Sequence, residues 1–161
     1  MSELIKLNHS DWLLGYCKDD PVRPHLPLAW RTQHGREVYA LQNDDSELDA
    51  VICVAYCTDV PENEQQLDVL SDINAPVAVF YTVWSYTQGA GRLMVNTAAE
   101  HIQLTKGCKR YVTLSPLTEM AERFHIKNGA TLLARHTTAQ NFEYKREAPA
   151  PESRKAVSAQ D

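Results

Sequence analysis

The chain has 161 residues, about the length of one domain, and its 43% hydrophobic and 23% charged residues are ordinary for a globular protein. Aspartate and glutamate (21) outnumber lysine and arginine (16), giving a net charge of −5, so a phosphate-neutralising surface and a nucleic-acid partner are not expected. We expect no membrane partner either, because no apolar run approaches ~18 residues and the first residues lack the basic start and apolar run of a secretory signal.

The first part of the chain predicts an edge strand, a helix and a hairpin. Residues 4–9 alternate apolar and polar side chains, as in an edge strand, and the polar pair before Trp12 can cap a helix there. Three prolines make residues 19–35 a loop with at most a helical turn. The β-branched and aromatic runs 36–42 and 48–58, separated by a turn cluster, predict a hairpin.

The middle of the chain predicts a central strand that turns into a long helix. Residues 59–75 are polar and predict a loop or a short helix. Residues 76–86 are almost continuously apolar, which favours a central strand. After a glycine turn, residues 92–104 carry apolar side chains at helical spacing, and Gly107 can end this helix.

The last part of the chain predicts one short buried strand, one helix and two further strands. The buried strand is 111–114, and Thr118 can cap a helix at 119–127. Residues 130–136 and 140–144 predict the final strands.

The order of these elements predicts the fold class, a mixed α/β (α+β) architecture with a central sheet flanked by helices. We expect residues 1–146 to form a single domain. Residues 147–161 are rich in proline, alanine and serine and predict a disordered C-terminal tail.

The cysteines and histidines indicate neither a disulfide nor a metal site. None of the four cysteines forms a C-x-x-C pair, and Cys53 and Cys57 lie in one predicted strand, too far apart to bridge. The histidines show no paired ligand spacing, so no metal is expected. Without a secretory signal, we expect reduced thiols and a cytoplasmic location.

The glycine turn between the central strand and the long helix has the character of an anion site. Gly89 and Gly91 let the main chain approach a ligand, and the N-terminus of the helix favours negative charge. Gln88, Ala90 and Arg92 complete the turn, and Arg92 can add a charged donor. A tight turn beside a solvated arginine would have the same sequence, so that interpretation stays open. Dinucleotide and P-loop motifs are absent, which leaves the pyrophosphate of a coenzyme A thioester as the expected ligand.

This strand–turn–helix unit resembles the GCN5-related N-acetyltransferase (GNAT) fold. Gly89 and Gly91 match the signature Gln/Arg-x-x-Gly-x-Gly/Ala that follows the fourth strand of that fold, while Tyr86 stands where the family prefers Gln or Arg. Residues 124–130 resemble its Tyr-x-x-x-Gly-Phe segment, with His125 at the tyrosine position that often serves as general acid. The resemblance implies a GNAT-like acyl-CoA N-acyltransferase fold that binds a coenzyme A thioester.

Three segments, in order, are similar to the catalytic domain of malonyl-CoA decarboxylase, itself built on the GNAT fold. These segments are residues 78–82 with 88–91, residues 112–116 and residues 124–130. The similarity implies that Ser115 is the catalytic serine and His125 the catalytic histidine, with malonyl-CoA or acetyl-CoA as substrate and no metal. The family's long insertion between these two motifs and its helical N-terminal domain have no counterpart in this sequence.

Decarboxylation of a malonyl thioester assigns a task to each of these groups. Ser115 can hydrogen-bond the carboxylate, and a histidine of near-neutral pKa at position 125 can protonate the α-carbon. Main-chain N–H groups of residues 82–86 can stabilise the enolate oxygen. We expect Trp84 to contact coenzyme A, together with residues 88–92. Purely structural interpretations also stand, with Ser115 ending a strand, His125 packing on the sheet and Trp84 filling the core or groove.

Three functions fit these observations. The first is a coenzyme A thioester decarboxylase, which the pair Ser115 and His125 favours. The second is an acyl-CoA-dependent acyltransferase, in which acidic residues of 61–72 would face a cationic acceptor. The third is a non-catalytic acyl-CoA-binding module, and the missing insertion and domain favour the second or third. In each case the expected partner is a small-molecule acyl-CoA, and a homodimer is compatible with the sequence.

Overall fold

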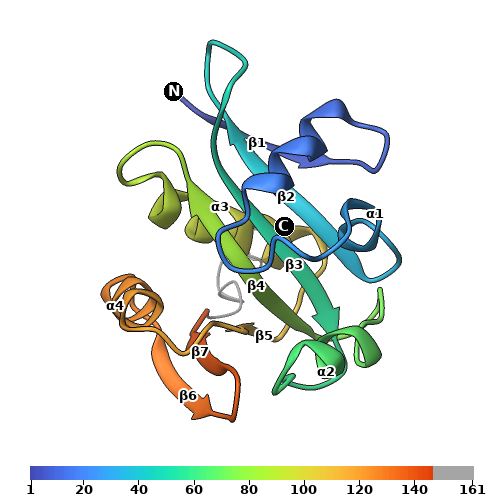
Figure 1. The fold of residues 1–161 in the computed structure, drawn as a ribbon, viewed down its shortest axis with the longest axis vertical. Coiled ribbons are helices and arrows are strands. Elements are labelled where there is room, and N and C mark those ends of the chain that lie inside the picture. Colours follow the sequence, from blue (N-terminus) through green and yellow to red (C-terminus); the bar gives the residue numbers. More distant parts are fainter. Residues whose placement is uncertain (147–161) are drawn as a thin grey trace, which may run out of the picture.

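In the computed structural model, which describes residues 1–146, seven strands form one mixed sheet with helices on both faces (Figure 1). The tail predicted at residues 147–161 lies outside the described residues. The strand order is β1-β2-β3-β4-β5-β7-β6, and β4 and β5 form the one parallel pair within residues 1–146. The strands are β1 (Glu3–Leu7), β2 (Arg36–Gln42), β3 (Leu48–Cys57), β4 (Val77–Ser85), β5 (Arg110–Thr113), β6 (Thr131–Arg135) and β7 (Gln140–Tyr144).

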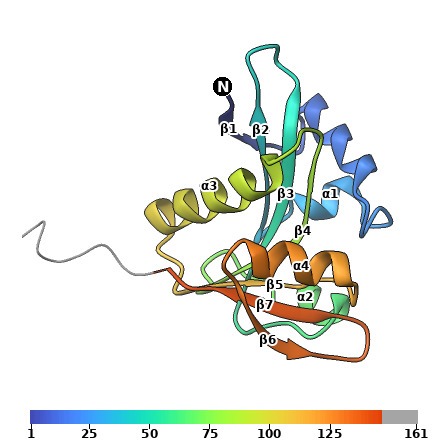
Figure 2. The same ribbon diagram turned by 90° about the vertical axis from the view of Figure 1, so that its left-hand side faces the viewer.

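Helices cover both faces of the sheet. They are the 3-10 helix η1 (Trp12–Asp19) and the α-helices α1 (Leu28–Arg31), α2 (Glu64–Val69), α3 (Ala90–Thr105) and α4 (Glu119–Lys127). Figure 2 shows α3 on one face of β1–β4, with η1 and α1 on the opposite face. In residues 1–146, no helix combines the length and the apolar character that crossing a membrane requires.

Most predicted elements are confirmed by the structure. β1 is an edge strand, β2 and β3 form the predicted hairpin, and β4 is the fourth of seven strands, as its apolar sequence indicated. The helix predicted at Trp12 differs in type: η1 is a 3-10 helix, and Gly15 within it lowers α-helical propensity. The loops predicted at 19–35 and 59–75 contain the short helices α1 and α2.

The core has one apolar cluster on each face of the sheet. Under α3, the predicted stripe is buried against alternate residues of β2, β3 and β4; its members are Met94, Val95, Ala98, Ala99 and Ile102. On the other face, Leu13, Leu14 and Cys17 of η1 pack on the opposite side chains of the same strands. Side chains of β4 belong to both clusters, so packing stabilises this strand on both faces. Full burial of each large aliphatic side chain contributes ~1.5–3 kcal/mol to the stability of the fold.

The central strands β4 and β5 diverge part of the way along β4. They pair from Val77 to Phe80, and the last bond of the pair runs from the Leu114 N–H to the Phe80 carbonyl, at 3.1 Å. β4 continues to Ser85, whereas the chain after β5 turns to pair with Gln140. The second half of β4 therefore has no strand on its β5 side.

Candidate active site

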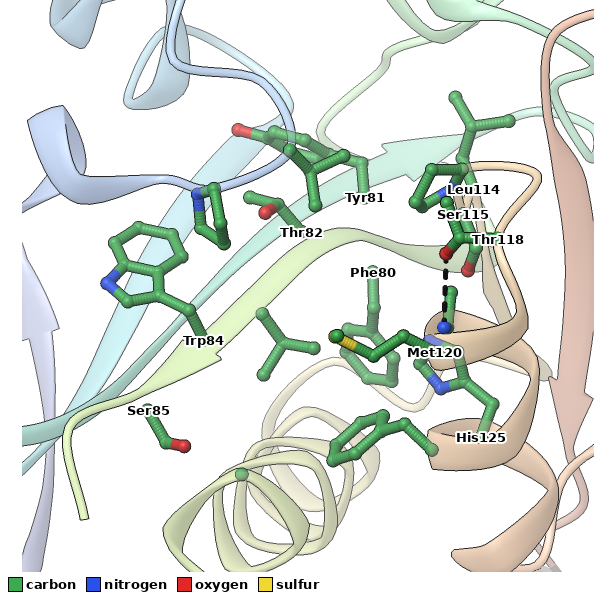
Figure 3. A pocket seen from close by; sticks show the side chains of 17 residues that line it. Phe80, Tyr81, Thr82, Trp84, Ser85, Leu114, Ser115, Thr118, Met120 and His125 are labelled. Carbon is green, nitrogen blue, oxygen red and sulfur yellow. Dashed lines mark hydrogen bonds between the residues drawn. The ribbon is translucent and has the colours of Figure 1, made fainter. Parts of the chain in front are cut away.

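A pocket of about 500 Å³ lies in the gap between the diverging strands (Figure 3). Its walls are the second half of β4, residues 114–116 after β5, the first part of α4 and the start of α3. Pro21 and Val22, from the loop after η1, also line it. The lining is mainly apolar, and within residues 1–146 no lysine, arginine, aspartate or glutamate side chain contributes to it.

Ser115 lies where the chain leaves β5 and is held there by β7. Its N–H donates to the Gln140 carbonyl at 2.8 Å, and its carbonyl accepts the Gln140 N–H at 2.9 Å. The Ser115 hydroxyl lies 2.8 Å from that of Thr113, which also accepts the Phe142 N–H at 3.0 Å. With that oxygen already accepting, Thr113 can donate to Ser115 and leave the serine proton for a pocket ligand. Ser115 thus lines the pocket as a fixed, buried hydroxyl.

His125 lines the same pocket from α4 and is 5% exposed. Its Nδ1 lies 2.7 Å from the Tyr144 hydroxyl, and its ring stacks on Phe142 with centroids 5.3 Å apart. Burial lowers the pKa of His125 from 6.5 to about 4, so the ring is neutral at pH 7. The expectation of a near-neutral pKa is therefore wrong, because the sequence does not reveal desolvation.

The neutral imidazole has two tautomers, and its partner favours one of them. Burial raises the pKa of Tyr144, so the phenol keeps its proton and can donate it to Nδ1 of His125. The proton of the ring then sits on Nε2, which has no hydrogen-bond partner within residues 1–146. Figure 3 shows His125 and Ser115 on the α4 side of the pocket, with Trp84 at the other end along β4.

The glycine turn reaches the pocket through one residue. Gly91 lines it, and a Cβ at this position would lie 3.1 Å from Cε1 of Phe124 on α4, so glycine allows α3 and α4 to approach. Gly89 has φ +82°, a left-handed conformation in which glycine begins the helix without strain. The other predicted turn residues lie beside the pocket rather than in its lining: Gln88, Gly89, Ala90 and Arg92. Arg92 is exposed on the first turn of α3, which is compatible with the alternative that it is a solvated arginine without a ligand.

Trp84 lines the pocket but also belongs to the apolar cluster under η1. Its indole N–H donates to the Tyr86 hydroxyl at 2.9 Å, and that hydroxyl donates to Asp19 at 2.7 Å. The polar end of Trp84 is therefore occupied, and only its apolar surface is offered to the pocket.

A buried charged network behind β4 was not predicted from the sequence. Arg31 is 0% exposed and donates to Asp20 at 2.8 Å, and Asp20 accepts from the Thr82 hydroxyl, also at 2.8 Å. Thr82 in turn lines the pocket. The prolines around Asp20 indicated a loop, and a polar loop sequence carries no signal that its charges are buried.

The acidic residues of 61–72 do not line the pocket, so an acceptor bound in the pocket itself would not contact them. Glu64 pairs with Arg23 at 3.1 Å, and Asp68 accepts the Trp30 indole N–H at 2.9 Å. These carboxylates hold the segment after η1 against α2 instead.

Chemically, the pocket combines a hydroxyl, a neutral imidazole and the start of a helix in an apolar surrounding. Hydrogen bonds and dipoles act more strongly in such a surrounding than in water. The arrangement suits a ligand with a phosphate group at the N-terminus of α3 and a carbonyl or carboxylate near Ser115 and His125.

No protein-family model matches this sequence, and no curated protein does. Solved structures do share its fold. The malonyl-CoA decarboxylase of Agrobacterium vitis superimposes with a TM-score of 0.75 at 17% identity, over 99% of this chain and 63% of that one. An acetyltransferase of Bacillus subtilis, solved in complex with CoA, gives 0.64 at 11% identity, over 91% of this chain and 100% of that one. GCN5 of Tetrahymena gives 0.58 at 14% identity, over 92% and 99%.

The predicted GNAT fold is thus confirmed, with its seven-stranded mixed sheet and flanking helices. The chain spans less than two thirds of the length of the Agrobacterium decarboxylase.

Proposed function

We propose that this chain binds a coenzyme A thioester between β4 and β5 and decarboxylates malonyl-CoA or a related acyl-CoA with Ser115 and His125. The observation that carries the proposal is that these two side chains, from different elements, line one pocket that also reaches Gly91 at the start of α3. Further support comes from solved proteins of the same fold, one named as a malonyl-CoA decarboxylase and another as an acetyltransferase in complex with CoA.

The turn at the start of α3 binds the pyrophosphate in this proposal. The first N–H groups of a helix have no acceptor within the helix, and the helix dipole favours an anion there. The exposed Arg92 adds a charged donor beside them. The thioester then extends along the apolar face of Trp84 toward Ser115 and His125.

The reaction breaks the bond between the α-carbon and the carboxylate. Carbon dioxide leaves, and the electron pair of that bond forms the enolate of the thioester. Ser115 bonds the carboxylate before cleavage, and main-chain N–H groups of β4 beyond Phe80 stabilise the enolate oxygen. Since no lysine or arginine of residues 1–146 lines the pocket, none of them forms an ion pair there that would oppose loss of the carboxylate's charge.

His125 acts in this scheme as a neutral donor. Its Nε2–H faces a strongly basic enolate and gives its proton to the α-carbon, after which the ring recovers a proton from water. The products are carbon dioxide and acetyl-CoA, and one solvent proton is consumed. Removal of a positioned proton donor slows such reactions by about 10²–10⁴-fold.

An acyltransferase remains the second candidate, because the fold is shared with acetyltransferases. Its acceptor amine would need a base, and the lowered pKa of His125, about 4, makes this ring a weak one. Decarboxylation uses the neutral donor form, so the electrostatics favour it over transfer.

The test is incubation of the protein with malonyl-CoA and no acceptor, followed by measurement of carbon dioxide and acetyl-CoA. We expect both products from the wild type and a loss of about 10²-fold or more in Ser115→Ala and His125→Ala, with CoA affinity retained. The matched controls are His9→Ala and Ser10→Ala, two exposed neighbours that do not line the pocket. Product formation only after an amine is added would replace this proposal with acyl transfer, and CoA binding without turnover would replace it with a binding module.

A further inference from the structure

β4 contains a bulge at the point where it leaves β5. Its register with β3 shifts between Cys53, opposite Thr82, and Val54, opposite Phe80, so Tyr81 is an extra residue on β4. As a result, Tyr81 and Thr82 both face the η1 side: Tyr81 packs in that cluster, and Thr82 bonds to Asp20. Bulges of this kind redirect the main chain and commonly lie beside active sites.

Asp20, just after η1, holds the second of these residues. Its Oδ1 accepts the Thr82 hydroxyl at 2.8 Å and the N–H groups of Val22 and Arg23 at 2.8 and 2.9 Å. Its Oδ2 accepts from Arg31 at 2.8 Å. Burial raises the pKa of Asp20, but these bonds outweigh it and lower the pKa below its usual value. Asp20 is therefore a buried, charged anchor that accepts four hydrogen bonds.

Arg23 holds the first residue of the bulge. Its guanidinium donates to the Tyr81 carbonyl, and its Nε donates to Glu64 at 3.1 Å. Arg31 ties the two anchors together, because it donates to Asp20 and, at 2.6 Å, to the Arg23 carbonyl. Two consecutive residues of the bulge are thus fixed by one charged network from a segment about 60 positions away in the sequence.

We propose that Asp20 and Thr82 are positioning residues, which hold the main chain of the β4 bulge so that its N–H groups on the open side meet the thioester carbonyl. The inference rests on the proposed function, since it assigns these N–H groups a substrate. Neither side chain takes part in bond breaking.

The location of the network argues for this role. Buried ion pairs are a weak source of stability compared with apolar packing, so a charged anchor is a poor way merely to fill the core. The Asp20–Arg31–Arg23 network bonds to Tyr81 and Thr82, which line the pocket. Both residues come directly after Phe80, which makes the last bond between β4 and β5. Displacement of a reacting group by about 1 Å can cost about 10²-fold in rate, which makes a rigid bulge valuable here.

The test compares Thr82→Val with Thr82→Ser and Thr105→Val. Thr82→Val removes the hydroxyl but leaves Asp20 its bonds to Val22, Arg23 and Arg31, so the anchor keeps its charge partners. Thr82→Ser restores a hydroxyl. Thr105→Val controls for the same change of side chain at an exposed position, where it removes a hydroxyl bond of 2.8 Å to the His101 carbonyl at the far end of α3. The measurements are kcat and KM for malonyl-CoA, the Kd for CoA and the thermal midpoint.

We expect kcat to fall about 10–100-fold in Thr82→Val, with KM, CoA affinity and thermal midpoint close to the wild type, and to recover in Thr82→Ser. Unchanged kcat in Thr82→Val, beside an active wild type, overturns the positioning role and leaves the proposed function intact. A parallel loss of kcat, CoA affinity and stability also overturns it, since that outcome describes a structural residue. A wild type that does not decarboxylate malonyl-CoA removes the proposed function, and this inference with it.

Discussion

Burial of His125 changes the pH range in which its ring can carry a charge, and the effect on stability can be calculated. In the folded chain the pKa is about 4, whereas the unfolded chain has the ordinary value of 6.5. Between these values the unfolded state binds a proton that the folded state does not, so stability falls as the pH falls. At about 1.4 kcal/mol per pKa unit, the loss is about 2 kcal/mol at pH 5 and about 3 kcal/mol at pH 4.

Replacement of His125 by asparagine removes this proton linkage. Between pH 7 and pH 5, we expect His125→Asn to lose about 2 kcal/mol less of its free energy of unfolding than the wild type loses. Urea unfolding at the two pH values measures the difference, and His9→Asn controls for removal of an exposed histidine.

The same argument predicts the titration of the ring itself. In imidazole NMR spectra, His125 should stay neutral at pH 5.5 with the proton on Nε2, and turnover should show no acid limb near pH 6.5. A His125 titration near 6.5, or equal losses of stability in His125→Asn and wild type, would refute the desolvation argument and return the histidine to a charged general acid.

Two further substitutions test the walls of the pocket and the orientation of the imidazole. Gly91→Ala brings a methyl group to 3.1 Å from the Phe124 ring, so CoA affinity measured by calorimetry should fall roughly tenfold, whereas Gly15→Ala, with no atom within 4 Å of the new Cβ, should bind as wild type does. Equal affinities would mean that the turn is only structural. Tyr144→Phe leaves Nδ1 of His125 without its partner, so stability should fall by about 1–3 kcal/mol in urea unfolding and turnover should fall with it; a variant as active and stable as the wild type would contradict the tautomer argument.

The parts of the fold that could be predicted are those with local signals. Thr118 caps α4 by accepting the Ala121 N–H at 3.2 Å, and Gly107 has the left-handed φ of +64° at the end of α3. Both depend on residues within one turn of the chain, which a sequence displays directly. The central position of β4 was also predictable, because a strand buried on both faces needs a nearly continuous apolar sequence.

The sequence motifs pointed to some of the residues that line the pocket, but not to the electrostatics of that pocket. Ser115, His125 and Gly91 were selected from motifs, and all three line one pocket. The low pKa of His125 comes from its burial, and Phe142 and Tyr144 of β7, about 20 positions later, are among the side chains that pack against its ring. Desolvation depends on such tertiary neighbours, so no pattern around position 125 could reveal it.

The charged network follows from the same divergence of strands that makes the pocket. Beyond Phe80, main-chain groups of β4 lose the partners that β5 would supply, and buried main-chain groups need replacements. The Arg23 guanidinium donates a hydrogen bond to the Tyr81 carbonyl in place of a neighbouring strand. Asp20 accepts the hydroxyl of the next residue, Thr82. The remaining groups on the open side face the pocket, where a ligand can satisfy them. The segment after η1 has the sequence of an ordinary loop. In the fold, its charged side chains bond to β4 where this strand has separated from β5.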